Sequence, residues 1–222
     1  MINVISYSIW GDLPFYWIGA QKNIELRDKY FPDFHIWVYV SKTNIIPEEY
    51  LIGKNIKIIR VDEKTEWGGM FHRFWAAADP EIDIFLSRDT DSRFSDREVA
   101  ALNEWLKSDK DFWIGRDHPF HTVPIMGGMF ACRNGILRDL DIIGKINSWK
   151  HFSAKGCDQD FLGQIIYPLV KDRAMEHSEF NLRFGGEIRP FPTKRKDYEY
   201  VGDIFDENDI RHPEYWKIIV GK

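Results

Sequence analysis

Short apolar segments typical of strands alternate along this chain with segments whose apolar residues recur at helical spacing. Because parallel strands need a long crossover between them, usually a helix, this alternation predicts an α/β fold with one mostly parallel sheet and helices on both faces. The ranges expected to form strands are 2–8, 34–40, 56–61, 82–86 and 112–115, followed by a short segment at 126–132. The ranges expected to form helices are 15–30, 68–78, 95–107, 136–149 and 158–170, and 183–196 is expected to be a surface loop.

Length and composition favour one globular domain over residues 1–222, with no internal repeat or linker. The net charge of −5 makes nucleic acid an unfavourable partner. Cys132 and Cys157 form no metal-ligand spacing and no disulfide framework. The chain begins without the pattern of a signal peptide and has no run of about 18 apolar residues, so we expect no transmembrane segment and a soluble, cytoplasmic protein.

The strand expected at 82–86 leads into two carboxylates one residue apart, Asp89 and Asp91. Side chains alternate along a strand, so the two carboxylates are expected on one side, where they can hold a hard divalent cation. Ser95 and Glu98 have the spacing of a capping box and can begin the next helix without help from either aspartate. The alternative is a pair of solvated turn aspartates that bond to their own backbone.

The two aspartates belong to an ordered series of motifs, which we list from the N-terminus: 71–75 (FHRFW), 89–91 (DTD), 115–119 (GRDHP), 127–129 (GGM) and 158–162 (DQDFL). The series resembles a group of bacterial and large-DNA-virus glycosyltransferases of the GT-A fold, which includes the first domain of a chlorovirus multidomain enzyme. The resemblance extends to about residue 206. A lone DxD motif is weak evidence, whereas the ordered series is more specific.

The resemblance implies an enzyme that moves a sugar from a nucleotide diphosphate donor, with UDP favoured, to a hydroxyl of a glycan acceptor on lipid or protein. It also implies Mn²⁺ or Mg²⁺ as cofactor, because a cation stabilises the charge that develops on the leaving diphosphate. Asp89 and Asp91 would hold the metal, Asp91 most directly, with His177 as third ligand. A surface histidine is the alternative for His177, and His118 and His121 are further candidates for a ligand or a sugar contact.

The resemblance places an acidic pair, Asp158 and Asp160, opposite the donor sugar. Asp158 is the expected catalytic base and Asp160 the second choice, since an inverting transfer needs a carboxylate to take the acceptor proton. The alternative for Asp158 is a helix N-cap. Inversion is favoured over retention because no separate nucleophile is evident.

Several further residues are candidates for binding the donor. Arg73 could reach the diphosphate or sugar, or be an ordinary ion-pairing arginine. Asp117 could bind sugar hydroxyls, and the basic run 194–196 could close over the diphosphate or be a solvated loop. The two glycines that could let the backbone approach the sugar, or form an ordinary bulge, are Gly127 and Gly128. The residues expected near the nucleotide base, at the end of the first strand, are Tyr7, Ser8 and Trp10.

Other DxD chemistries fit the sequence less well. A haloacid-type phosphatase needs Thr or Val where Arg93 stands, and a calcium loop counted from Asp89 needs Gly and Glu where Phe94 and Ala100 stand. A sugar nucleotidyltransferase needs a Gly-rich loop after the first strand, which residues 9–14 lack. A non-catalytic nucleotide-sugar or carbohydrate-binding module is the remaining alternative, since a metal-holding motif does not prove turnover.

Overall fold

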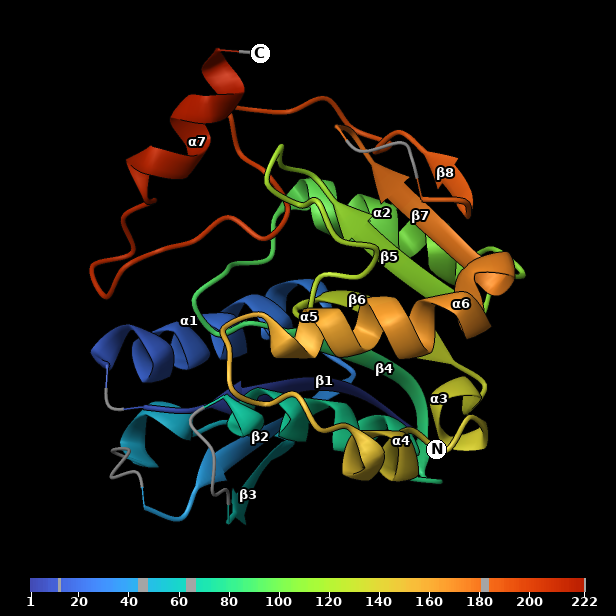
Figure 1. The fold of residues 1–222 in the computed structure, drawn as a ribbon. Coiled ribbons are helices and arrows are strands. Elements are labelled where there is room, and N and C mark those ends of the chain that lie inside the picture. The colour runs from blue at the N-terminus through green and yellow to red at the C-terminus, as the bar shows by residue number, and fades with distance from the viewer. Residues whose placement is uncertain (12, 44–47, 63–66, 181–183, 222) are drawn as a thin grey trace.

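A computed structural model describes residues 1–11, 13–43, 48–62, 67–180 and 184–221. The fold is built on one eight-stranded sheet with the strand order β3-β2-β1-β4-β6-β5-β7-β8 (Figure 1). Its strands are β1 (Ile2–Ile9), β2 (Phe34–Ser41), β3 (Ile56–Val61), β4 (Ile82–Arg88), β5 (Phe112–Arg116), β6 (Met129–Arg133), β7 (Ala174–Ser178) and β8 (Glu187–Arg189). Only β6 runs antiparallel to its neighbours, β4 and β5, so the expected mostly parallel α/β sheet is confirmed.

Helical segments connect the strands. The α-helices are α1 (Pro14–Tyr30), α2 (Asp96–Leu106), α3 (Ile136–Asp139), α4 (Ile142–Ser148), α5 (Cys157–Phe161), α6 (Tyr167–Val170) and α7 (Pro213–Val220). The other helical turns are the 3₁₀ helices η1 (Glu48–Leu51), η2 (Gly68–Ala78) and η4 (Lys171–Arg173), and the π-helical turn η3 (Leu162–Ile166). Within the described ranges, no helix has the length and apolar character needed to cross a membrane.

Two expected helices are interrupted for local reasons. The range 136–149 forms α3 and α4 because Asp141 adopts a left-handed conformation, with φ of 53°, and its carboxylate caps α4 by accepting from Gly144 N at 3.1 Å. The range 158–170 stays helical but widens at η3, just before Pro168, which has no N–H to donate.

Three elements near the C-terminus were not expected from the sequence. β7 carries three polar residues among five, β8 lies within the range expected to be a loop, and α7 is a short helix near the C-terminus. Residue 183, the first of that expected loop, lies outside the described residues.

Each face of the sheet has its own apolar core. Val4 and Phe85 pack on the face covered by η2 and α3 to α6, here called the η2 face. Ile5 and Leu86 pack on the face covered by α1 and α2, here called the α1 face. Because successive strand residues point to opposite faces, each position in β1, β4 and β7 is assigned to one of the two.

Only half of the expected capping box forms at the start of α2. Ser95 is the N-cap, and its hydroxyl accepts from Glu98 N at 3.2 Å. The Glu98 carboxylate instead forms a fully buried ion pair with Arg88 at 2.6 Å. The expectation that neither Asp89 nor Asp91 caps this helix is correct.

Phe130 tests the packing of the η2-face core. Its ring is 1% exposed, stacks on Phe112 with centroids 5.4 Å apart, and contacts Phe74 and Phe85. We expect Phe130→Ala to lower the free energy of unfolding by about 3–5 kcal/mol, since it opens a cavity that rigid neighbours cannot fill. Urea denaturation measures this. The control Phe120→Ala, at a side chain 59% exposed, should change stability by less than about 0.5 kcal/mol, and an equal loss in both variants would contradict the assignment.

Candidate functional site

The buried guanidinium of Arg73 pairs with two other residues of the predicted site, Asp89 and Asp158. One terminal nitrogen, Nη1, forms an ion pair with Asp89, and the other, Nη2, donates to Asp158 Oδ2 at 2.7 Å. Arg73 is 4% exposed and Asp158 is 1% exposed, whereas 45% of the Asp89 side chain is accessible. The site thus lies where η2, the turn after β4 and the start of α5 come together.

Two serines of β1 fix the backbone of Arg73. The Ser6 hydroxyl donates to the Arg73 carbonyl at 2.7 Å, and the Ser8 hydroxyl accepts from the Arg73 N–H at 2.9 Å. Both serines point to the η2 face, because they alternate with Ile5 and Tyr7 on the α1 face. Ser8 therefore positions Arg73, where the sequence had suggested a contact with the nucleotide base.

Gly127 and Gly128 pass so close to this cluster that no side chain fits. A Cβ on Gly127 would overlap Asp158 and Arg73, and a Cβ on Gly128 would overlap the Asp89 carboxylate. Ser87 holds this backbone in place by donating to the Gly127 carbonyl at 2.6 Å. The backbone of the two glycines therefore closely approaches the site's own charged side chains, and its expected approach to a sugar stays a prediction.

The Asp89–Asp91 segment is a turn that follows β4, and its backbone is held by distant residues. Asn23 Nδ2 of α1 donates to the Thr90 carbonyl at 3.1 Å and to the Ser92 carbonyl at 2.8 Å. Phe205 N donates to the Asp91 carbonyl at 2.8 Å. These bonds fix the turn without using either carboxylate.

A buried ion pair on the α1 face supports the same turn from behind. Arg88, paired with Glu98, also donates to Ser92 Oγ at 2.9 Å, and that hydroxyl donates to the Asp89 carbonyl at 3.0 Å. Burial raises the pKa of Glu98 to about 7 against the opposing charge of Arg88. The conformation of the turn therefore depends on a buried charge pair on the far face of the sheet.

Negative charge accumulates around the turn. Burial and the neighbouring charge of Asp89 raise the pKa of Asp91 to about 6. Burial also raises the pKa of Asp158, with the charge of Asp89 adding to it and that of Arg73 opposing it. The Tyr16 pKa is raised by burial and by the two turn aspartates, which places this phenol beside them. An environment that disfavours additional negative charge is one that a bound cation would relieve.

The carboxylates suit a divalent metal that shares its coordination with a ligand. Among described residues Asp91 forms no ion pair, and Asp89 has one oxygen engaged by Arg73. In the described part of the chain no three His, Cys, Asp or Glu side chains gather as a metal site. Mg²⁺ and similar ions commonly take one or two carboxylates and complete their shell with phosphate oxygens and water, so the two aspartates fit that arrangement.

His177 does not join these aspartates. It alternates with Glu176 in β7 and points to the α1 face, where Nδ1 accepts from Trp113 Nε1 at 2.9 Å and Nε2 lies 3.3 Å from Glu104 Oε2. Asp89 projects to the opposite, η2 face. The expected third ligand therefore lies apart from the aspartates in this structure, with both ring nitrogens engaged on the other side of the sheet.

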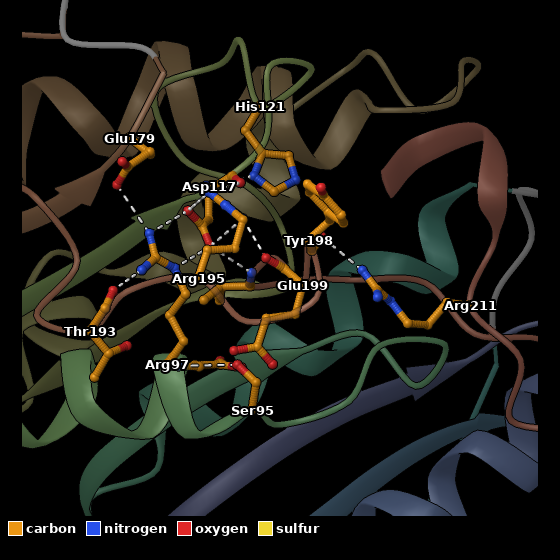
Figure 2. A network of polar contacts seen from close by, with 12 residues as sticks. Ser95, Arg97, Asp117, His121, Glu179, Thr193, Arg195, Tyr198, Glu199 and Arg211 are labelled. Carbon is orange, nitrogen blue, oxygen red and sulfur yellow. Dashed lines mark hydrogen bonds and ion pairs between the residues drawn. The ribbon is translucent and has the colours of Figure 1, made fainter. Parts of the chain in front are cut away.

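Asp117 anchors the C-terminal segment through buried ion pairs. It is fully buried, pairs with Arg97 at 2.8 Å and Arg195 at 2.7 Å, and accepts from Val201 N at 3.0 Å (Figure 2). Arg195 thereby turns inward from the basic run, so only Lys194 and Lys196 keep the character of a solvated loop. The expected sugar contact of Asp117 is not supported.

The histidines of the loop after β5 are also structural. His121 Nδ1 accepts from Asp117 N at 3.0 Å, and burial lowers the His121 pKa to about 3. His118 Nε2 lies 3.0 Å from the Tyr215 carbonyl, and its Nδ1 accepts from Phe120 N at 3.1 Å. These contacts engage both ring nitrogens of His118 and Nδ1 of His121.

Three other predicted residues lie apart from the Arg73 cluster. Tyr7 is 1% exposed in the α1-face core, and burial raises its pKa, so the expected base contact is not supported. Trp10 stacks on His72 with ring centroids 5.5 Å apart. Asp160 is exposed and lies about 200° around the helix from Asp158. Asp158 itself is not the N-cap of α5, which is Gly156.

Sequence reasoning missed the residues that position the site. These are Ser6, Asn23, Ser87, Arg88 and Glu98. The available signal was polar residues inside otherwise apolar strands and helices, since buried polar groups need partners. This pattern predicts that a residue has a hydrogen-bond or ion-pair partner, but it does not identify the partner.

No protein-family model and no curated protein matches the sequence. Solved structures share the fold. A glycosyltransferase involved in glycosylation of the major capsid of PBCV-1 matches with a TM-score of 0.53 and 16% identity, over 82% of this chain and 84% of that one. The mannosyltransferase PcManGT from Pyrobaculum calidifontis, in complex with GDP-Man and Mn²⁺, matches with 0.53 and 13%, over 81% of this chain and 55% of that one.

A third neighbour catalyses a different reaction. The 4-diphosphocytidyl-2C-methyl-D-erythritol synthase from Anaerococcus prevotii matches with a TM-score of 0.51 and 14% identity, over 82% of this chain and 91% of that one. At these identities the likeness establishes the fold, which is that of GT-A glycosyltransferases, as the motif series implied. Because proteins with names as different as these share the fold, the reaction must be argued from the site.

The Arg73–Asp158 pair can be tested by a double-mutant cycle. We expect Arg73→Met to lower the free energy of unfolding by about 3–5 kcal/mol, because it leaves the Asp158 carboxylate buried without its cation. Adding Asp158→Asn should recover part of that loss, giving a coupling energy of about 1–3 kcal/mol in urea denaturation. The same cycle with Arg173→Met and Asp111→Asn, a pair whose arginine side chain is 57% exposed, should give a smaller coupling. Additive losses at Arg73 and Asp158 would contradict the proposed pairing.

Proposed function

We propose that this protein is a metal-dependent glycosyltransferase that moves a sugar from a nucleotide diphosphate donor, favoured as a UDP-sugar, to a hydroxyl of a glycan acceptor. The observation that carries the proposal is the Arg73 bridge, which holds Asp89 of the DxD turn and Asp158 of α5 beside the Gly127–Gly128 backbone. One residue of the metal motif and one potential base are thereby held at a fixed spacing in a GT-A fold.

The turn aspartates supply the metal site of the proposal. A Mn²⁺ or Mg²⁺ ion held by Asp89 and Asp91 would stabilise the negative charge of the leaving diphosphate as a Lewis acid. The chain's own contribution is to keep both carboxylates oriented before the donor arrives. Asn23, Arg88 and Phe205 do so by fixing the turn backbone or the serine beside it.

Asp158 is the proposed base for an inverting transfer. Its Oδ2 accepts from Arg73, while its Oδ1 is buried without a hydrogen-bond partner in the described structure. An acceptor hydroxyl that donates to Oδ1 would give that oxygen its missing partner and could pass its proton to it during attack. Burial, which raises the Asp158 pKa, makes this carboxylate a stronger base than an exposed aspartate.

The proposal also covers the donor, the acceptor and the extent of the catalytic domain. The GDP-Man and Mn²⁺ complex of the P. calidifontis neighbour supports a nucleotide sugar with a divalent metal. The acceptor is a glycan on lipid or protein, met at the cytoplasmic side, and residues 1–222 form one catalytic domain. Nucleotidyl transfer is the second candidate, because one fold neighbour synthesises a diphosphocytidyl product.

Metal-dependent donor binding tests the DxD turn. We expect UDP-glucose, UDP-galactose or GDP-mannose with Mn²⁺ to raise the melting temperature, by an amount equal to about 2.7 kcal/mol of stabilisation at a hundredfold excess over Kd. Asp89→Asn and Asp91→Asn should each abolish this shift and leave the fold intact. Asp83→Asn, at the opposite end of β4, is the matched control and should keep the shift. If no sugar nucleotide stabilises the wild type with Mn²⁺, the proposal fails.

The reaction products separate the candidate functions. A glycosyltransferase releases a nucleoside diphosphate from its donor, whereas a nucleotidyltransferase releases pyrophosphate from a nucleoside triphosphate. We expect nucleoside diphosphate from the donor identified by thermal shift. Asp158→Asn should lower kcat about 10²–10⁴-fold while donor binding stays within a few fold, because the proton acceptor is lost.

Asp160→Asn is the control for this loss of turnover, since Asp160 is exposed and outside the Arg73 cluster. We expect it to retain most of the activity. Pyrophosphate release would establish the nucleotidyltransferase instead. Donor binding without turnover on any acceptor or water would favour the non-catalytic binding module.

A further inference from the structure

A hollow lies behind the DxD turn and shares no lining residue with the Arg73 cluster. It encloses about 340 Å³ between the end of α1, the segment 93–96 and the C-terminal segment 196–211. We call it the strap pocket, after the C-terminal segment that forms one wall. Its rim includes exposed Asp96 and Lys196, and its floor is buried. The volume falls within the range of small-ligand sites.

The floor holds one acceptor and one donor that lack partners. Asp203 is 4% exposed, and its Oδ2 pairs with Arg211 while its Oδ1 has no hydrogen-bond partner in the described structure. Arg93 is 7% exposed, and its Nη2 is likewise unpartnered, although its Nε pairs with Asp209 at 2.9 Å. Buried polar atoms without partners are uncommon in folded proteins and mark places where a ligand can supply the missing bond.

Aromatic rings form much of the remaining wall. Phe94 and Tyr200 are almost fully buried, and Phe205 and Tyr30 complete the apolar surface. The parts of these rings that line the pocket offer apolar contact to the C–H groups of a ligand, while the unpaired atoms offer polar contacts. A ligand with both apolar and hydroxyl character fits this combination.

The charges around the pocket select against an anion. The basic residues that line it are Arg93, Lys196 and Arg211, and the acidic ones are Asp96, Asp197, Glu199 and Asp203. Because acidic residues are in excess, a phosphate or nucleotide would meet net repulsion. A neutral ligand avoids this cost.

We propose that the strap pocket binds a sugar unit of a neutral glycan. A sugar hydroxyl both donates and accepts, so one unit can donate to Asp203 Oδ1 and accept from Arg93 Nη2 while its ring packs on the aromatic wall. The identification of this sugar as part of the acceptor rests on the proposed function. The saccharide site itself is independent of it.

The strap pocket is linked directly to the DxD turn. Arg93, which lines the pocket, donates through Nη1 to the carbonyls of Thr90 at 3.1 Å and Ser92 at 3.0 Å. Phe205, also in the lining, donates its N–H to the Asp91 carbonyl at 2.8 Å. A glycan held here is thus anchored to the same turn whose carboxylates face the donor.

Ligand-observed NMR by saturation transfer tests the pocket, with lactose and the methyl glycosides of glucose, galactose and mannose as probes. At least one probe should bind wild-type protein, and Asp203→Asn should weaken it about tenfold by removing the charged acceptor. Asp111→Asn is the matched control. Asp111 is a comparably buried aspartate paired with Arg173 outside the pocket, and its variant should bind as the wild type does.

Tyr30→Leu serves as the second variant, since it removes an aromatic side chain of the pocket lining that has no part in fixing the DxD turn, and it decides the question if Asp203→Asn unfolds. We expect it also to weaken binding several-fold. Donor stabilisation with Mn²⁺ should persist in both variants, so a failure of donor binding in the wild type counts against the proposed function and leaves the pocket test unaffected. The proposed saccharide site is wrong if no probe binds the wild-type protein, or if the folded variants bind the probe as tightly as the wild type does. It is also wrong if a nucleotide sugar with Mn²⁺ displaces the probe, or if inorganic phosphate binds more tightly than the probe.

Discussion

The site is organised by one buried cation. Arg73 is paired with residues 16 and 85 positions further along the chain, and a guanidinium enclosed this deeply is tolerated only when carboxylates compensate its lost hydration. Asp89 and Asp158 provide that compensation, and the buried Asp158 carboxylate in turn requires the guanidinium. The close approach of the Gly127–Gly128 backbone follows from the same packing, because any side chain there would displace a member of the cluster.

Strand alternation decides which polar residues can reach this cluster. Ser6, Ser8 and Ser87 point to the η2 face, where two of them bond to the Arg73 backbone and the third to the Gly127 carbonyl. Tyr7 and Arg88, their neighbours in sequence, point to the α1 face. The η2 face therefore carries the charged groups that would meet ligands, whereas residues on the α1 face fix the conformation of the DxD turn.

Local pattern was enough for most of the fold and part of the site. The ranges 2–8, 34–40 and 56–61 were expected as strands because their apolar residues are dense, whereas β7, with its buried Glu176 and His177, carries no such signal. Arg73, Asp89 and Asp158, which the motif series singled out, lie in one cluster. The places of His177 and Asp117 differ from those expected, because face and ion-pair partner are set by elements far away in sequence. No local pattern contains that information.

The conformation of the DxD turn depends on contacts with residues far away in the sequence. Asp117, at the end of β5, fixes Arg195 and the Val201 amide, which fastens the C-terminal segment across the molecule. That segment then delivers the Phe205 N–H to the Asp91 carbonyl. Because every bond in this series joins residues distant in sequence, the turn acquires its shape only when the whole domain is folded. Asp117, which the sequence had suggested as a sugar contact, thus contributes to the site by holding in place the segment that shapes it.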